Sequence, residues 1–219
     1  DMLIVADAAQ SFGARQDDAA VGVLAPVTTT SFFPAKPLGC FGDGGAVLTT
    51  DGELAEALRS IRAHGKGAGK YDIVRVGLNG RLDTLQAAVL LAKLEVFDDE
   101  LIARERVARH YDARLSGLVQ LPGRNNGSQS AWAQYTIQTE GRDELATALK
   151  ANGVPTAIYY PVPMHLQSAY QAYGDGQGSV PVAESLCSRV LSLPMHPYLD
   201  DATIDQVCDA VESTLKAGT

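Results

Sequence analysis

The chain has 219 residues, of which 46% are hydrophobic and 20% are charged, an ordinary composition for a folded globular protein. This length allows one large domain or two small ones. A formal net charge of −8 and a sequence pI of about 4.9 argue against a general nucleic-acid-binding surface, although a few local groups could still hold a nucleotide.

The cysteine content and the hydropathy pattern exclude two further classes. Cys40, Cys187 and Cys208 are sparse and lack CxxC spacing, so we expect free thiols and no metal site, as in a reducing cytoplasm. No apolar run approaches 18 residues. We therefore expect a cytoplasmic protein without a membrane span.

The chain opens on the apolar run 3–6, which predicts a buried parallel strand. Such a strand needs neighbours in its sheet, so we expect this chain to be the C-terminal part of a longer enzyme. Asp7 follows the strand at its carboxyl end, where α/β sheets place ligands. Two interpretations of Asp7 stay open: a cap of the following turn, or a carboxylate that faces a ligand.

A second strand is predicted over residues 27–33, and Lys36 lies between it and the glycine-rich turn 39–45. Burial is costly for an ammonium group and lowers its pKa. A neutral amine can attack a carbonyl carbon and form a Schiff base. The alternative is that Lys36 extends from the strand end into solvent. The turn does not have GxGxxG spacing, so we reject a dinucleotide-binding fold.

The rest of the chain alternates helices and strands. Residues 82–115 predict two helices or one long kinked helix, and 117–130 a linker. The other elements expected are an antiparallel strand at 46–50, a helix from 51 to about 64, strands at 132–138 and 156–160, and helices at 142–151 and 201–215.

Four motifs occur in order along the chain: Asp7–Ser11, Ser31–Lys36, Gly42–Ala46 and Gly77–Arg81. Together they resemble the nucleotide-sugar aminotransferases of the DegT–DnrJ group, which are fold-type-I pyridoxal phosphate (PLP) enzymes. The second motif continues in this chain as far as Cys40. In this longer form it is most similar to the motif of enzymes that aminate UDP-2-acetamido-2-deoxy-3-oxo-glucuronate, a precursor of O-antigen sugars in bacterial lipopolysaccharide.

This resemblance implies an α/β fold, the C-terminal part of a fold-type-I aminotransferase. Residues 1–100 would form part of the large PLP-binding domain, with its mostly parallel sheet. Residues 101–219 would form a linker helix and a small α+β domain. The same resemblance implies a homodimer with a shared active site. No nucleic-acid partner and no membrane are expected, from the net charge and the hydropathy pattern described above.

The resemblance also implies roles for particular residues. Lys36 would bind PLP covalently and act as the catalytic base, while Asp7 would pair with the pyridine nitrogen. Gln10 and Ser31 would contact other polar edges of the cofactor. Asn79 would reach the PLP phosphate of the neighbouring subunit.

The substrates implied are a UDP-linked keto-sugar and an amino acid donor, with glutamate expected. Arg81 could hold a uronate carboxylate in a bidentate fork; its alternative is a surface pair with Asp83. Tyr159 and His165 are the other candidate substrate contacts.

Two rival functions stay open. A sugar dehydratase of the same fold would carry His at the position of Lys36, which disfavours it. A non-catalytic PLP-binding or interaction protein is the rival from another class.

Overall fold

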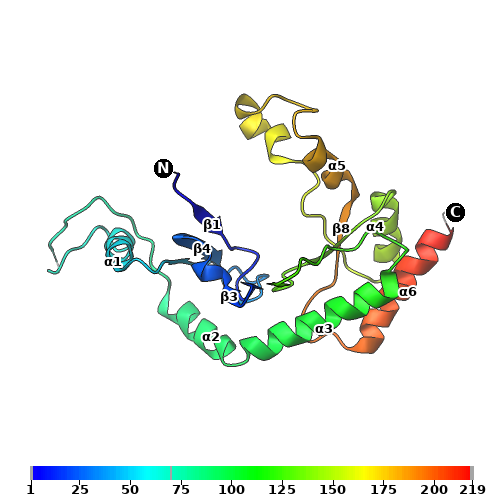
Figure 1. Cartoon of the computed structure of the whole chain (residues 1–219), viewed down its shortest axis with the longest axis horizontal. Helices are drawn as coiled ribbons and strands as arrows, with labels where there is room; N and C mark the ends of the chain where they lie inside the picture. Colours follow the sequence, from blue (N-terminus) through cyan, green and yellow to red (C-terminus); the bar gives the residue numbers. More distant parts are fainter. Residues whose placement is uncertain (1, 70, 218–219) are drawn as a thin grey trace. The chain divides into compact units, whose positions relative to one another are not determined.

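The computed structural model describes residues 2–69 and 71–217. It divides into two compact units (Figure 1). The first runs to Ile102 and includes Asn125–Ala133. The second holds Ala103–Arg124 and the chain from Gln134 onward.

A three-stranded sheet is the centre of the first unit. Its order is β1 (Val5–Asp7), β4 (Val27–Ser31), β5 (Gly45–Leu48). β1 runs parallel to β4, and β5 runs antiparallel to it, as predicted. The buried side chains of Thr28 and Thr30 alternate with less buried ones along β4, as expected for a strand with two unlike faces.

The first strand is shorter and more exposed than predicted. It includes only the last two residues of the run 3–6, and Leu3 and Val5 are 97% and 60% exposed. The prediction of a buried strand is therefore wrong for this chain, because β1 pairs with β4 on one side and with no other described strand. The predicted strand 27–33 likewise ends at Ser31, where the Phe33 amide donates to Ser31 Oγ at 3.2 Å.

A second small sheet lies in a region predicted to be loop. Its order is β3 (Ala19–Ala20), β2 (Arg15–Gln16), β6 (Ser128–Gln129), all antiparallel. Asp17 and Asp18 connect β2 to β3 with φ of 46° and 64°, the positive values that a tight two-residue hairpin turn requires. A short 3-10 helix, η1 (Val21–Val23), follows.

Helix α1 (Gly52–Ile61) is defined by residues at both of its ends. Asp51 caps its start, because its carboxylate accepts two backbone amides of the first turn. The Gly65 amide donates to the Ser60 carbonyl at 2.8 Å, and His64 adopts φ 66°. Two successive left-handed residues, His64 and Gly65 (φ 74°), thus follow the end of the helix.

Two separate helices follow, α2 (Thr84–Leu94) and α3 (Phe97–Leu115), as the sequence allowed. α2 buries Leu90 but leaves Leu85 and Leu91 82% and 66% exposed. The apolar face of α2 is thus only partly covered by the residues that the structure describes.

The second unit pairs β7 (Tyr135–Gln138) antiparallel with β8 (Val190–Leu193). The predicted strand 156–160 is wrong: only Ala157 in this stretch forms a bridge, to Ser192. Pro155 and Pro161 flank the stretch, and proline has no backbone N–H to give to a ladder. The helices of this unit are α4 (Arg142–Ala151), α5 (Pro181–Arg189) and α6 (Asp201–Ala217).

A polar network is built into the edge of this unit's core. Tyr135 is fully buried, and its hydroxyl donates to Asp112 Oδ1 at 2.6 Å. Asp112 Oδ2 accepts two hydrogen bonds from Arg124, at 2.6 and 2.8 Å. Burial, and then the hydrogen bond to Asp112, raise the pKa of Tyr135, so its hydroxyl stays a donor at any physiological pH.

A loop over residues 163–180 is closed by one carboxylate. The loop contains two 3-10 helices, η2 (Met164–Leu166) and η3 (Ser168–Tyr173). Glu184 of α5 accepts from the Gly178 amide at 2.9 Å and from the Val180 amide at 3.2 Å, and it pairs with His165 Nε2 at 3.0 Å. The backbone bond from Gly178 is the main cause that lowers the pKa of Glu184, and His165 lowers it further.

Tyr135→Phe tests the buried network. The change removes the donor to Asp112 Oδ1 and leaves Arg124 as the partner of Oδ2. We expect the free energy of unfolding to fall by about 1.5–3 kcal/mol, as for a hydrogen bond to a charged group. Urea unfolding of the variant measures this. Tyr173→Phe is the matched control, because Tyr173 is 87% exposed. Equal effects of the two changes would show that the network adds no stability.

Glu184→Gln tests the closure of loop 163–180. A lowered carboxyl pKa contributes stability above the unfolded-state value of about 4.3, and this contribution is lost as pH falls through the lowered pKa. We expect the amides of Gly178 and Val180 to be less protected from hydrogen exchange in the variant at pH 7 and in the wild type at pH 3 than in the wild type at pH 7, each measured against the intrinsic exchange rate at that pH. Glu212→Gln, at an exposed pair with Lys216, is the control. Unchanged exchange in both cases would refute the closure.

Candidate functional site

In the first unit, the neighbouring parallel strands β1 and β4 end at the same edge of the sheet. Asp7 is in register with Thr29, and the next amide, of Ala8, donates to the Thr29 carbonyl at 2.7 Å. Thr30 Oγ1 donates back to the Ala8 carbonyl at 3.2 Å. This edge carries four of the predicted site residues on the segments that leave it: Asp7, Gln10, Ser31 and Lys36.

Asp7 caps the following turn, one of the two interpretations that the sequence left open, and its role toward a ligand stays a prediction. Its Oδ1 accepts the Ala9 amide at 3.0 Å and so caps the turn that follows β1. The side chain is nevertheless exposed at the carboxyl end of the strand, as is that of Gln10 in the same turn. A capped carboxylate is held in one orientation and can still accept a donor from a ligand.

Lys36 lies in a tight turn just after β4. Its amide donates to the Phe33 carbonyl at 2.9 Å, and its side chain is half-buried. Within residues 2–69 and 71–217, no hydrogen bond or ion pair is formed by its ammonium group.

The backbone beyond Lys36 is packed against itself, as the glycine content of this stretch predicts. A Cβ atom at Gly39 would lie 2.6 Å from the Pro34 carbonyl oxygen and 2.7 Å from that of Phe33, so no side chain fits there. The Cys40 amide donates to the Phe32 carbonyl at 2.8 Å, and its buried thiol lies 3.1 Å from the same oxygen. This packing fixes the path of the turn.

Sequence reasoning missed two side chains that contact this turn. Gln86 Oε1 accepts the Phe41 amide at 2.8 Å, and Lys93 Nζ donates to the Gly39 carbonyl at 2.6 Å. Both residues belong to α2. The sequence signal was their spacing of seven residues, which places them on one helix face.

Asn79 and Arg81 lie on another segment of the first unit. The stretch around them runs antiparallel to the chain that leaves α1, with a bridge between Ala63 and Asn79. Both side chains are exposed. The alternative role of Arg81 is not realised in the described structure, because no ion pair joins Arg81 to Asp83.

Tyr159 and His165 belong to the second unit. Tyr159 is 42% exposed, and its ring packs edge-on to that of Tyr160. His165 Nε2 is already engaged by Glu184, a structural role that the sequence did not reveal. The structure therefore brings four predicted residues to one sheet edge and leaves the other four on separate segments.

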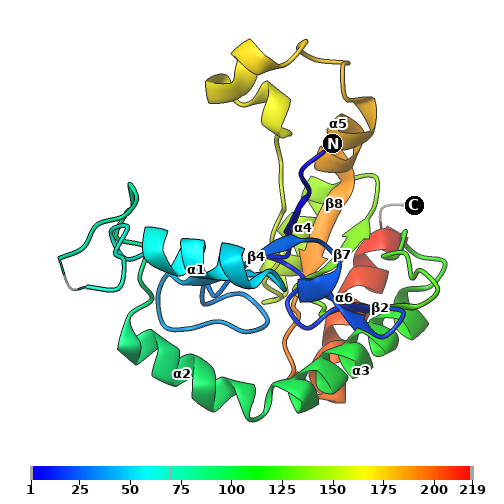
Figure 2. The same ribbon diagram turned by 60° about the vertical axis from the view of Figure 1, so that its left-hand side comes forward.

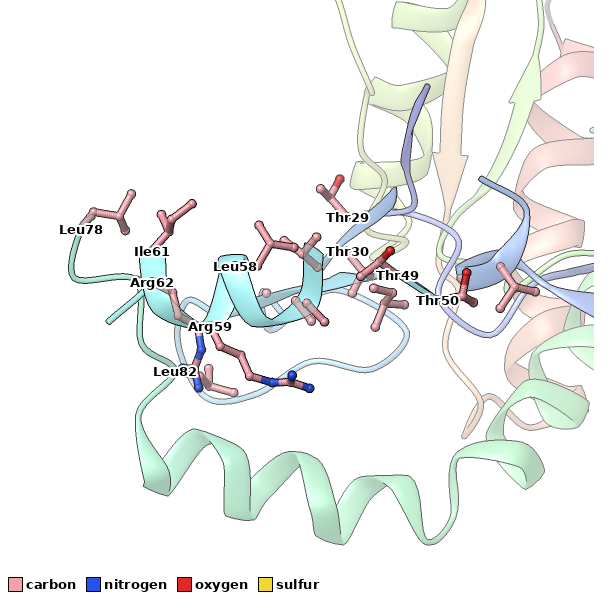
Figure 3. Close-up of a pocket in the computed structure, with 18 residues that line it drawn as sticks. Thr29, Thr30, Thr49, Thr50, Leu58, Arg59, Ile61, Arg62, Leu78 and Leu82 are labelled. Carbon is pink, nitrogen blue, oxygen red and sulfur yellow. The ribbon is translucent and has the colours of Figure 1, made fainter. Parts of the chain in front are cut away.

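A pocket of about 970 Å³ lies elsewhere in the first unit (Figure 3). β4, β5 and α1 supply most of its lining, which includes Thr29, Leu58 and Arg62. α1 and β4 lie near one another in both ribbon views (Figures 1 and 2), and both contribute residues to the lining of this pocket. Neither Lys36 nor Asp7 lines this pocket. The pocket and the candidate site at the sheet edge are therefore separate features.

No group of three or more His, Cys, Asp or Glu side chains in the described residues could hold a metal ion, and Cys40, Cys187 and Cys208 are free thiols. No helix in the described ranges is both long enough and apolar enough to cross a membrane.

Comparison with known proteins places this geometry in a family. Residues 1–212 match the DegT/DnrJ/EryC1/StrS aminotransferase family. The chain is 47% identical over 209 residues to UDP-2-acetamido-2-deoxy-3-oxo-D-glucuronate aminotransferase of Pseudomonas aeruginosa, which covers 95% of this chain and 57% of the relative. The chain thus spans little more than half the length of such relatives.

Solved structures agree with the sequence match. A DegT DnrJ EryC1 StrS aminotransferase from Brucella abortus is 53% identical with a TM-score of 0.93, over 96% of this chain and 57% of its own. DesV of S. venezuelae is 43% identical with a TM-score of 0.95, over 98% of this chain and 58% of its own. The α/β structure described above is therefore similar to part of a sugar aminotransferase fold, and the chain belongs to the DegT/DnrJ/EryC1/StrS family of PLP-dependent sugar aminotransferases.

Proposed function

We propose that the protein transfers an amino group from glutamate to the keto group of a UDP-linked 3-oxo-glucuronate, with Lys36 as the residue that binds PLP. The observation that carries this proposal is that Lys36, a half-buried residue in the turn that follows β4, has an amine with no partner among the described residues. A family of aminotransferases needs such an amine, and the chain offers it at the sheet edge where ligands bind.

The side chains at this edge fit the chemistry of the cofactor. Lys36 supplies the amine for its aldehyde carbon, Asp7 a carboxylate for its ring nitrogen, and Ser31 a hydroxyl for its phosphate. Gln10 adds an amide beside Asp7. When bound, PLP supplies an electron sink for the carbanion formed at the reacting carbon.

Lys36 would also act in proton transfer. With PLP bound, Lys36 Nζ would be the general base that removes the α-proton of glutamate. In the second half of the reaction, Nζ returns a proton to the sugar carbon that receives nitrogen. The balance is glutamate plus keto-sugar to 2-oxoglutarate plus amino sugar.

The names of several relatives support position 3 of the sugar as the site of amination. The Pseudomonas aeruginosa relative acts on a 3-oxo-glucuronate, and a 42% identical relative from Acidithiobacillus ferrooxidans is a 3-aminotransferase of UDP-N-acetyl-3-dehydro-glucosamine. A 45% identical relative from Streptomyces venezuelae is a transaminase of a dTDP-3-amino sugar. For a uronate, the exposed guanidinium of Arg81 is the proposed partner of the carboxylate. Tyr159 and His165 stay predicted substrate contacts.

We propose further that the enzyme is a homodimer in which Asn79 completes the cofactor site of the neighbouring subunit. The stretch before Asn79 supports this, because its large apolar side chains are exposed in the described chain: Tyr71, Ile73, Val74, Val76 and Leu78. Exposed apolar groups gathered on one segment favour contact with another protein surface. Synthesis of O-antigen and lipopolysaccharide sugars in the cytoplasm is the setting proposed for this activity.

Lys36→Ala tests the proposed function. We expect the rate of amino transfer to fall by at least about 10³-fold, because the general base is lost together with the covalent attachment point. Mass spectrometry of the UDP-sugar after reaction with ¹⁵N-glutamate measures this rate. Lys150→Ala, at an exposed lysine in the last turn of α4, is the control. Wild-type rates in Lys36→Ala would overturn the assignment.

Mixed dimers test the role of Asn79. Lys36→Ala and Asn79→Ala should each be nearly inactive alone. If Asn79 acts across the interface, random 1:1 subunit exchange regenerates one intact site in half of the dimers, so activity recovers to about one quarter of wild type. If Asn79 acts within its own subunit, no site is restored and the mixture stays inactive, which would contradict the shared site.

A further inference from the structure

One face of α2 is built to contact the backbone that follows Lys36. Gln86, Leu90 and Lys93 are spaced by four and three residues and so share this face. Leu90 is 6% exposed and packs in a cluster with Phe32, Leu38 and other buried residues of the turn. The face therefore has an apolar centre with one polar side chain on each side.

The two polar side chains hold successive parts of the same backbone. Lys93 Nζ donates to the Gly39 carbonyl at 2.6 Å, and Gln86 Oε1 accepts the Phe41 amide at 2.8 Å. The residue between them, Cys40, is 1% exposed. Lys93 Nζ also lies 5.9 Å from the centroid of the Phe41 ring. We name Gln86 and Lys93 together the α2 clamp.

The clamp adds to the few backbone hydrogen bonds that close this stretch. Residues 32–44 have no regular secondary structure, and the amides of Phe32, Lys36 and Cys40 make their backbone bonds to Gly44, Phe33 and Phe32. Phe41 is 78% exposed, so burial does not fix it. A lysine normally keeps its ammonium group in water, whereas Lys93 is half-buried and directs its charge at a carbonyl oxygen. Such charge-assisted bonds are stronger than neutral ones.

We infer that Gln86 and Lys93 are positioning residues for Lys36: they hold the 39–41 backbone so that the Lys36 amine stays in reach of the reacting carbon. This inference rests on the proposed function of Lys36. Lys36 is three residues before Gly39, whose carbonyl Lys93 holds, and the Gly39 backbone packs against the carbonyls of Phe33 and Pro34. If the backbone moves at Gly39, the turn that carries Lys36 therefore moves with it.

The test compares disruptive and conservative variants in the complete protein. Gln86→Leu and Lys93→Met remove the acceptor and the donor, while Gln86→Glu and Lys93→Arg keep them. Gln206→Leu and Lys150→Met, at exposed helix positions, are the matched controls. The measurements are single-turnover release of 2-oxoglutarate from glutamate, the KM for glutamate, and hydrogen exchange of the 38–42 peptide.

A displacement of about 1 Å can cost up to about 10²-fold in rate, so we expect Gln86→Leu and Lys93→Met to slow release by about tenfold. The KM for glutamate should stay within about twofold, because a positioning loss affects the chemical step. Exchange of the 38–42 peptide should quicken by at least about fivefold, since its hydrogen bonds open. The conservative variants and the controls should stay near wild type.

The outcomes separate this inference from the function it rests on. No release of 2-oxoglutarate by the wild type would refute the proposed function and the positioning role together. Release by the wild type, with equal rates and equal exchange in Gln86→Leu and Lys93→Met, would refute the positioning role alone. If the disruptive variants fail to fold, loss of rate in a folded Lys93→Arg or Gln86→Glu with unchanged exchange would refute it as well.

Discussion

The closed backbone turn from Ser31 to Cys40 is the constraint on which the candidate site depends. It begins where β4 ends, and it is closed by the Lys36 amide on Phe33 and by the Cys40 amide on Phe32. The close approach at Gly39 leaves no room for a side chain. A reactive lysine needs a fixed backbone and a free side chain, and this turn gives Lys36 both.

The neighbouring strand and helix act on this same turn. β1 runs parallel to β4 and so delivers Asp7 to the edge from which Lys36 departs. α2 reaches the turn from its other end through Leu90 and the clamp residues. The second unit has its own polar supports: Asp112 holds Tyr135 and Arg124, and Glu184 closes loop 163–180. Each unit is thus stabilised by hydrogen bonds that join segments distant in sequence.

The sequence predicted best where the signal is local. Helix 142–151 was predicted with its observed bounds, because Gly153 stops it and its apolar residues recur with helical spacing. The strand at 156–160 failed because flanking prolines outweigh a β-prone composition. The prediction that the run 3–6 is buried failed because burial requires neighbouring strands, and a strand's own residues do not show whether these are present. Lys36, Asp7 and Ser31 could be placed at strand ends from motif order, whereas the contacts of Gln86, Lys93 and His165 depend on tertiary structure.

Borohydride reduction of the PLP-treated protein, followed by peptide mass mapping, tests the central assignment most directly. Reduction converts a covalent link between an amine and the cofactor into a stable phosphopyridoxyl group. The assignment predicts this group on the peptide that contains Lys36, and on no peptide from a Lys36→Ala variant. A phosphopyridoxyl group found instead on Lys93, or on no lysine of the wild-type protein, would contradict it.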